Sequence, residues 1–378
     1  MRRPLYGQQQ IENEACLVPP TPMNIYTPLS LMFPTRAAPT NPRRIVLILP
    51  CCIGDVVLGT AALCALRRAY PDAHITWAVG RWSRAALEGH DLLNEVLDTG
   101  EGALPITSVA SLRAFAEQLR AGNFDLAVSL VRSPLMSLAV WLARIPYRAG
   151  LDSAGRGFGY NIRAPINPQT VRHEAEIYLD VPRALGLDTT GCWANVPVRE
   201  SRAGDEPYIV INPAGGRNPG MTMDSKRYPP PQLAEVANRI GKALKAKVIV
   251  VAGKDDQPLV EAVSAHLDRP PAAFVGVLTF RQIAALAHGA RVYIGNDTGL
   301  THLAAAAGAK TVMILGPTDP KRYAPFTPDS IALWKPATVA QRGVAAGGPT
   351  DWDWARDGIS VDEAERQIRK FLGVSRVL

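Results

Sequence analysis

A segment of small and polar residues, 295–302, joins an apolar run to a run of alanines. The apolar run is typical of a buried strand and the alanines of a helix, so the segment lies where a strand ends and a helix begins. Unpaired amides and the positive end of the helix dipole favour a phosphate there, at Thr298, Gly299 and Leu300. Alternatively, Asp297 or Thr298 only caps the helix, and the local sequence does not separate these roles.

Two basic side chains could act on the same phosphate. His302 falls in the first turn of the expected helix, where it could donate a hydrogen bond or simply pack. Lys226 follows a loop rich in glycine and proline, 212–216, which itself comes after a strand-like run. A lysine after such a loop can bring a point charge to a diphosphate, although solvated lysines are common.

A carboxylate follows the first apolar run of the chain, residues 45–49. Asp55 stands at the carboxyl end of that expected strand, the edge at which doubly wound sheets bind ligands. There it could accept the proton of an attacking hydroxyl, or cap the helix that begins at Val56, and the two roles are compatible.

Arginines after another strand-like run, 126–130, suggest how a second substrate could bind. We expect Arg132 and Ser133 to contact the acceptor, because a planar guanidinium suits bidentate contact with carboxylates or phosphates. A solvated surface arginine is the alternative for Arg132. Neither half of the chain has a complete GxGxxG after a strand or a P-loop, which argues against dehydrogenases and nucleoside triphosphatases.

The elements that must position these residues alternate between strands and helices. Strands expected in the first half are 45–49, 75–79 and 126–130, with helices from Val56, at 81–88 and at 111–120. In the second half, the expected strands are 208–212, 248–252, 292–295 and 311–315, and the expected helices 231–244, 258–267, 280–288 and 299–307. This alternation predicts an α/β protein with two doubly wound, Rossmann-like domains whose strand ends face a common cleft.

Polar and proline-rich stretches predict the domain boundaries. Residues 1–42 lack a sustained period and are expected to be a poorly ordered tail. A first domain then covers 43–200, a polar linker ends at Pro207, and a second domain covers 207–350. The last segment, 351–378, contains a closing helix at 362–372 that we expect to dock across both domains.

Composition sets the class of protein and of partner. The chain has 378 residues, of which 47% are hydrophobic and 20% charged, so disorder is excluded as its dominant state. Neither a membrane-spanning apolar run nor a secretory signal is visible, so we expect a cytoplasmic protein with reduced cysteines. The net charge of +7 without a block of like charges favours a phosphorylated small molecule or an anionic membrane surface over nucleic acid.

Together these residues resemble glycosyltransferase family 9, the lipopolysaccharide heptosyltransferase family. The resemblance rests on GDVVL at 54–58, NPAG at 212–215 with Lys226 ahead of Pro229, and NDTGLTHL at 296–303 followed by GPTDP at 316–320. It covers about residues 43–326, and the last two motifs in that order are highly specific.

The resemblance implies a GT-B fold, with an N-terminal acceptor domain and a C-terminal nucleotide-sugar domain. It implies inverting transfer without a metal or other cofactor, most simply of heptose from ADP-heptose to a lipopolysaccharide-type or other glycan acceptor. Since such an acceptor is anionic and lipid-linked, the basic net charge predicts peripheral contact with the inner face of the cytoplasmic membrane. It assigns the general base to Asp55. Donor contacts fall on Lys226, Asp297, Thr298, Gly299, Leu300 and His302.

The chain departs from the family pattern near the expected ribose contact. Where relatives commonly have a glutamate, it reads GKDD at 253–256, so Asp255 or Asp256 must hold the ribose or that contact is lost. This departure leaves a non-catalytic nucleotide-sugar binding protein as one alternative, and a nucleotide-sugar epimerase, which shares the two-domain fold, is another. The epimerase would need further acids and bases in the cleft; the non-catalytic protein is disfavoured by the retained Asp55 and Lys226.

Overall fold

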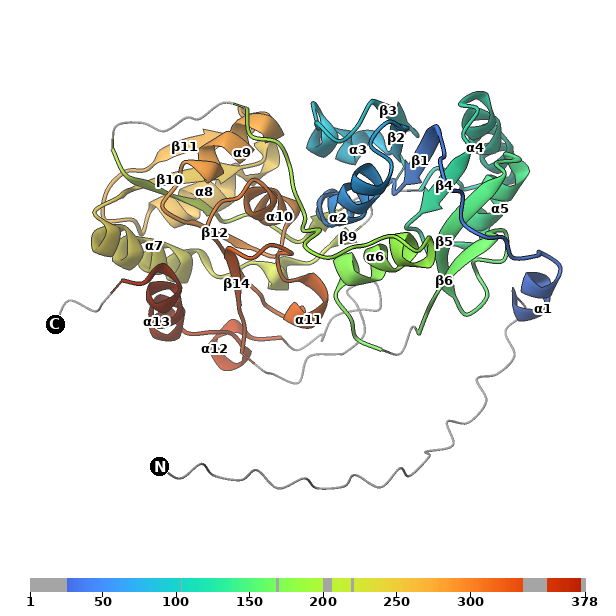
Figure 1. Cartoon of the computed structure of the whole chain (residues 1–378). Coiled ribbons are helices and arrows are strands. Elements are labelled where there is room, and N and C mark those ends of the chain that lie inside the picture. Colours follow the sequence, from blue (N-terminus) through green and yellow to red (C-terminus); the bar gives the residue numbers. More distant parts are fainter. Residues whose placement is uncertain are drawn as a thin grey trace, which may run out of the picture.

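The computed structural model describes residues 26–102, 104–167, 170–199, 206–218, 221–335 and 352–374. It contains two six-stranded, fully parallel sheets with helices on both faces, which lie side by side (Figure 1). The prediction of two doubly wound domains is therefore confirmed.

The first sheet has the order β3-β2-β1-β4-β5-β6. Its strands are β1 Arg44–Ile48, β2 His74–Val79, β3 Glu95–Asp98, β4 Leu126–Ser129, β5 Tyr147–Ser153 and β6 Ile162–Ile166. The helices around it are α1 Tyr26–Leu31, α2 Ile53–Ala69, α3 Arg81–Arg84 with the 3-10 turn η1 Ala85–Leu87, α4 Val109–Ala121, α5 Pro134–Leu142 and α6 Glu174–Ala184. The strand order reverses between β1 and β4, so a ligand crevice is expected beyond their carboxyl ends.

The second sheet repeats this topology, with the order β11-β10-β7-β12-β13-β14. Its strands are β7 Tyr208–Asn212, β10 Lys247–Ala252, β11 Ala272–Val275, β12 Tyr293–Asn296, β13 Thr311–Ile314 and β14 Ser330–Leu333, and a hairpin, β8 Arg217–Asn218 with β9 Met221–Thr222, follows β7. Its helices are η2 Asp224–Lys226, α7 Pro230–Leu244, η3 Lys254–Asp256, α8 Gln257–Ser264, α9 Phe280–His288, α10 Gly299–Ala306, α11 Pro320–Tyr323, α12 Trp354–Asp357 and α13 Val361–Leu372. Here the order reverses between β7 and β12, which carry the two predicted phosphate-binding segments.

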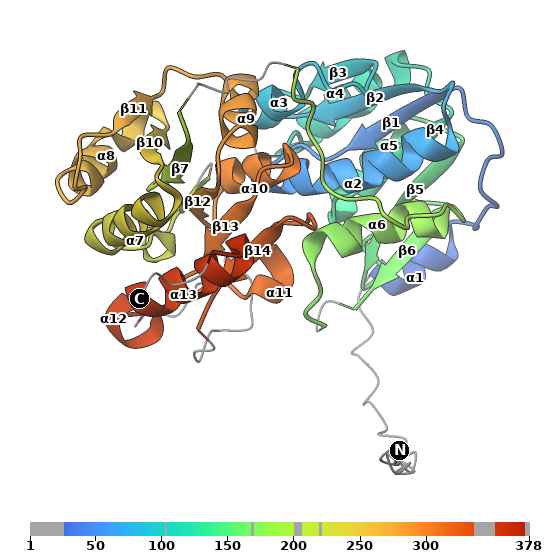
Figure 2. The same ribbon diagram turned by 60° about the vertical axis from the view of Figure 1, so that its left-hand side comes forward.

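One apolar core joins the two domains. It runs from the first sheet through Leu58 of α2 and Leu179 of α6 to Ala304 of α10 and Tyr293 of β12. Helices α2 and α10 lie next to each other in both views (Figures 1 and 2). The two switch points therefore face each other at short range.

Part of the expected tail belongs to the first domain. Phe33 packs against Trp141 and Phe158, and its carbonyl accepts a hydrogen bond from Arg163 at 2.8 Å. The backbone amide of Arg36 donates to the carbonyl of Asn161, also at 2.8 Å. The prediction of poor order is thus wrong for 26–42, because aromatic packing and edge contacts at β6 outweigh the polar composition; residues 1–25 lie outside the described ones.

The closing helix α13 packs on the second domain. Its Ile368 and Ala364 share a core with Ile240 of α7, and Arg239 of α7 pairs with Glu365 at 3.0 Å. The expectation that this helix spans both domains is wrong, since its apolar stripe is covered by α7. Residues 200–205 of the predicted linker are not described.

Candidate functional site

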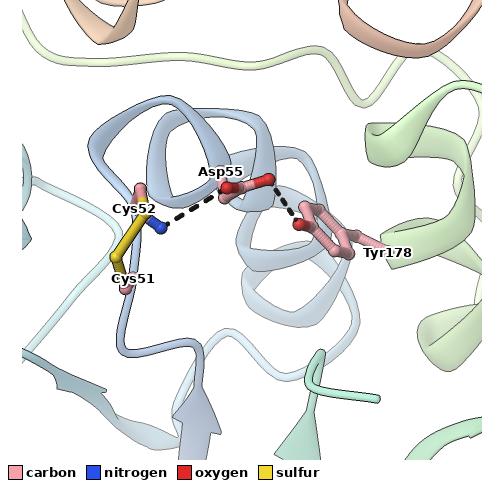
Figure 3. The surroundings of a disulfide bond; sticks show 4 residues. All are labelled: Cys51, Cys52, Asp55 and Tyr178. Atoms are coloured by element: carbon pink, nitrogen blue, oxygen red, sulfur yellow. Dashed lines mark hydrogen bonds between the residues drawn. A yellow bond between two sulfur atoms is a disulfide. The ribbon is translucent and has the colours of Figure 1, made fainter. Parts of the chain in front are cut away.

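Asp55 lies in the first turn of α2, beyond the carboxyl end of β1. The backbone amide of Cys52 donates to one of its carboxylate oxygens at 3.4 Å, so Asp55 has part of the predicted capping role. The hydroxyl of Tyr178, from α6, donates to the other oxygen at 2.8 Å (Figure 3). Both oxygens are thereby oriented, one by its own helix and one by a neighbouring helix.

The surroundings of Asp55 suit a general base. Burial, followed by the nearby carboxylate of Glu174, raises the pKa of Asp55 above its ordinary value. The hydrogen bonds from Tyr178 and Cys52 and the charge of Arg132 oppose this shift in part. A carboxylate with a raised pKa takes a proton more readily than an ordinary aspartate.

Cys51 and Cys52, just before α2, form a disulfide (Figure 3). The expectation of reduced cysteines is therefore wrong for this pair, because the turn after β1 brings the adjacent sulfurs together. Cys64 and Cys192 are free thiols, and Cys16 is outside the described residues.

The predicted phosphate-binding segment forms the start of α10. Thr298 is the N-cap, and its hydroxyl accepts a hydrogen bond from the amide of Leu300 at 3.2 Å. Gly299 lies against α2, where a Cβ at this position would come within 2.6 Å of the side chain of Ile53. Glycine is therefore required for the two helix starts to approach each other.

Lys226 and Asp297 form a buried ion pair at this helix start, with the ammonium 2.7 Å from a carboxylate oxygen. Burial alone would raise the pKa of Asp297, but Lys226 and His302 hold it below its ordinary value. The lysine predicted to meet a diphosphate is thus already fixed in place by Asp297. An ammonium group has three N–H donors, so the pairing leaves others for a ligand.

His302 faces the first domain from α10. A Cβ at Gly54 would come within 3.1 Å of its ring. Burial lowers the pKa of His302 to about 4, so the ring is neutral near pH 7 and keeps one N–H donor. Its Nδ1 is buried without a hydrogen-bond partner in the described part of the chain.

These side chains line one cleft of about 440 Å³ between the domains. Every residue predicted for catalysis or donor binding lines it: Asp55, Lys226, Asp255, Asp256, Asp297, Thr298, Gly299, Leu300 and His302. A cleft of this size lies within the range of small-molecule sites. The two domains thus place one carboxylate opposite a buried cation and a helix start.

The two candidate ribose contacts differ in their surroundings. Asp256 accepts a hydrogen bond from the amide of Gly253 at 3.2 Å and so caps η3, whereas Asp255 is exposed. Asp255 therefore has the freer carboxylate for a ribose hydroxyl.

The predicted acceptor residues lie outside the lining of this cleft. Arg132 pairs with Glu174 of α6, and the hydroxyl of Ser133 caps α5 by accepting from the amide of Met136. Their role in acceptor binding stays a prediction, and both have a structural partner.

Sequence reasoning missed several residues at this site. Trp82, Phe280 and Tyr323 line the cleft, while Glu174 and Tyr178 lie behind Asp55. The apolar spacing of α6 could have revealed that helix, but the proline within it obscures the pattern. No local motif marks a tyrosine that meets an aspartate 123 positions earlier.

Within the residues described, no helix is long and apolar enough to cross a membrane. The same residues contain no group of three or more His, Cys, Asp or Glu side chains placed to hold a metal ion.

Comparison with known proteins agrees with this geometry. The family model of glycosyltransferase family 9 (heptosyltransferase) matches residues 112–345. The chain is 24% identical over 301 residues to lipopolysaccharide heptosyltransferase 3 of Escherichia coli, covering 74% of this chain and 86% of that protein. It is 25% identical over 307 residues to lipopolysaccharide heptosyltransferase 2 of E. coli K12, covering 75% and 85%.

Solved structures show the same two-domain architecture. A family 9 glycosyltransferase from Veillonella parvula superimposes with a TM-score of 0.74 at 22% identity, covering 89% of this chain and 99% of that chain. The E. coli ADP-heptose lipopolysaccharide heptosyltransferase II gives a TM-score of 0.67 at 19% identity, covering 87% and 98%. These likenesses confirm the predicted GT-B fold.

Proposed function

We propose a specific reaction for this chain, which belongs to glycosyltransferase family 9, the heptosyltransferase family, and is a glycosyltransferase. It transfers heptose from ADP-heptose to a lipopolysaccharide-type acceptor. The transfer inverts the anomeric configuration and needs no metal ion. The observation that carries the proposal is the single cleft in which Asp55 of one domain faces Lys226 and the start of α10 of the other. The names of the E. coli relatives support the choice of sugar and acceptor.

The donor is proposed to bind on the second domain. Its diphosphate meets the amides at the start of α10, the ammonium of Lys226 and the neutral ring of His302, while Asp255 holds the ribose. These groups are fixed before the donor arrives, because Asp297 pairs with Lys226 and Thr298 caps the helix. Such preorganised donors stabilise the negative charge that develops on the departing diphosphate.

Asp55 is proposed to start the transfer. It takes the proton of the acceptor hydroxyl, whose oxygen then forms a bond to the anomeric carbon as the bond from that carbon to the phosphate breaks. ADP leaves with the electron pair of the broken bond. A single displacement from the side opposite the diphosphate inverts the anomeric configuration.

In this proposal, protein groups supply the charge that some transferases draw from a divalent cation. Treatment with EDTA should therefore leave turnover essentially unchanged. A strict requirement for Mg²⁺ or Mn²⁺ at saturating donor would contradict metal-independent transfer.

The proposed acceptor is an anionic glycolipid, which places the enzyme at the inner face of the cytoplasmic membrane as a peripheral protein. The net charge of +7 supports such contact through scattered arginines.

A donor screen tests the proposed function. The purified chain is incubated with ADP-heptose, other ADP-sugars and UDP-sugars, each with and without a lipopolysaccharide core acceptor that lacks heptose. Mass spectrometry should show ADP release and acceptor mass gain with ADP-heptose only when the acceptor is present. If other nucleotide sugars are turned over and ADP-heptose is not, the proposed donor is wrong. If the donor is isomerised when no acceptor is present, the protein is an epimerase.

A further inference from the structure

The amino end of α6 holds a carboxylate that both domains share. Glu174 is 1% exposed. It pairs with Arg132, which follows β4 of the first domain, and with Arg322 of α11 in the second, whose guanidinium lies 2.6 Å from a Glu174 oxygen. Because removing one partner of a buried ion pair is costly, the position of α6 depends on the contact between the two domains.

One helical turn further along α6, Tyr178 reaches the carboxylate of Asp55. Tyr178 is four positions after Glu174, so the two side chains project from the same face of α6. The Tyr178 hydroxyl donates to an Asp55 oxygen at 2.8 Å. Figure 3 shows the two side chains in contact. Tyr178 is buried and belongs to the apolar core that joins the domains.

Charged and titratable groups from several elements surround Asp55. Glu174 raises the pKa of Asp55, whereas Tyr178 and Arg132 lower it. Burial and the charges of Glu174 and Asp55 raise the pKa of Tyr323 on α11. The neutral ring of His302 on α10 lies next to Gly54. The protonation of Asp55 therefore depends on α6 and on the groups that orient α6.

We propose that Glu174 and Tyr178 are positioning residues for Asp55, and that Arg322 links this positioning to the seating of the donor domain. This inference rests on the proposed function, in which Asp55 is the base. Tyr178 orients one oxygen of the carboxylate, and Glu174 fixes the helix that carries Tyr178. When the second domain is seated, Arg322 completes the pairing of Glu174.

The two roles predict opposite effects on Asp55. Tyr178→Phe removes a hydrogen bond to the carboxylate, so the pKa of Asp55 should rise. Glu174→Gln removes a neighbouring negative charge, so the pKa of Asp55 should fall. If α6 only supported the fold, the two variants would not shift the pKa of Asp55 in opposite directions.

The titration of Asp55 is measured by ¹³C NMR on full-length protein labelled at the aspartate side-chain carboxyls. The Asp55→Asn variant identifies the resonance. Tyr70→Phe and Glu176→Gln are the matched controls, since Tyr70 donates to the carbonyl of Pro39 and Glu176 pairs with Arg183 on the far side of the turn. Both controls should titrate as the unmodified chain does.

Turnover of ADP-heptose supplies the second readout. Tyr178→Phe should lower kcat about tenfold with little change in KM for the donor, and should move the acidic limb of the pH–rate profile upward. Phenylalanine cannot donate a hydrogen bond to Asp55 at any pH. The kcat of Tyr178→Phe should therefore stay low even on the plateau of the pH–rate profile.

If the Glu174→Gln variant does not fold, Arg132→Gln provides a second test of the charges around Asp55. It removes a positive charge that favours ionised Asp55, so the pKa of Asp55 should rise. The inference is overturned if folded Tyr178→Phe and either charge variant leave the Asp55 titration where the controls leave it. Because the titration uses no donor, a chain that turns over no ADP-heptose would refute the proposed function without altering this result.

Discussion

At the scale of single residues, the site depends on polar groups that burial forces into pairs. Asp297 stays ionised in a buried position because the ammonium of Lys226 lies 2.7 Å away. His302 stays neutral because burial lowers its pKa by more than the nearby charge of Asp297 raises it. One side chain of the cleft, Asp297, is thus charged, and another, His302, is neutral near pH 7.

His302 makes the stability of the protein depend on pH. Its pKa is about 4 in the folded chain against an ordinary 6.5. Between these values the unfolded chain binds a proton that folded His302 does not, so its contribution is complete above pH 6.5 and is lost as pH falls towards 4. A difference of about 2.5 units (6.5 minus 4) corresponds to about 3 kcal/mol.

We therefore expect His302→Asn to flatten the fall in the free energy of unfolding between pH 6.5 and 4. Urea denaturation at several pH values measures it, with the exposed His266→Asn as the control. An unchanged pH dependence in His302→Asn would contradict the buried neutral ring.

At the scale of elements, the sequence predicts central strands better than edge strands. Strands such as β1 and β7 are buried on both faces and therefore appear as continuous apolar runs. The four edge strands β3, β6, β11 and β14 and the inner strand β5 are not among the predicted strands. The edge strands β3 and β11, for example, are short and have exposed positions, so their pattern is weak. The candidate donor-binding residues of α10 and η3 were predicted because they follow the ends of the central strands β12 and β10. Glu174 and Tyr178 reach Asp55 only through tertiary packing.

The contact between α2 and α10 gives a prediction at this scale. Gly299→Ala would place a Cβ 2.6 Å from Ile53, so the helix starts must move apart. We expect turnover to fall about tenfold or more while the fold is kept, because the base and the donor site would be misaligned.

Adding Ile53→Gly to Gly299→Ala should restore much of the turnover, since it removes both Ile53 atoms, Cγ2 and Cβ, that the new methyl group would meet at 2.6 and 2.8 Å. Steady-state kinetics and circular dichroism measure both variants. If the double variant is as slow as Gly299→Ala alone, the loss arises from the phosphate contact and not from the approach of the helices.

At the scale of the whole molecule, charge supports the proposed location. Scattered arginines attract an anionic bilayer, and salt screens such attraction beyond about 8 Å at physiological ionic strength. Vesicles that contain anionic lipid should retain the protein at low salt and release it near half-molar salt (about 0.5 M), and neutral vesicles should not retain it. Equal co-sedimentation with both kinds of vesicle at low salt would contradict membrane contact while leaving the transferase assignment intact.

The central claim is that a base from one domain acts on a donor held by the other, and Asp55→Ala tests it most directly. Calorimetry should give nearly native donor affinity, because the donor groups lie on the second domain. Turnover should fall roughly 100-fold or more, the usual scale for a positioned general base. An Asp55→Ala enzyme that binds donor and turns over at a near-native rate would contradict the account and leave Asp55 with only its helix-capping role.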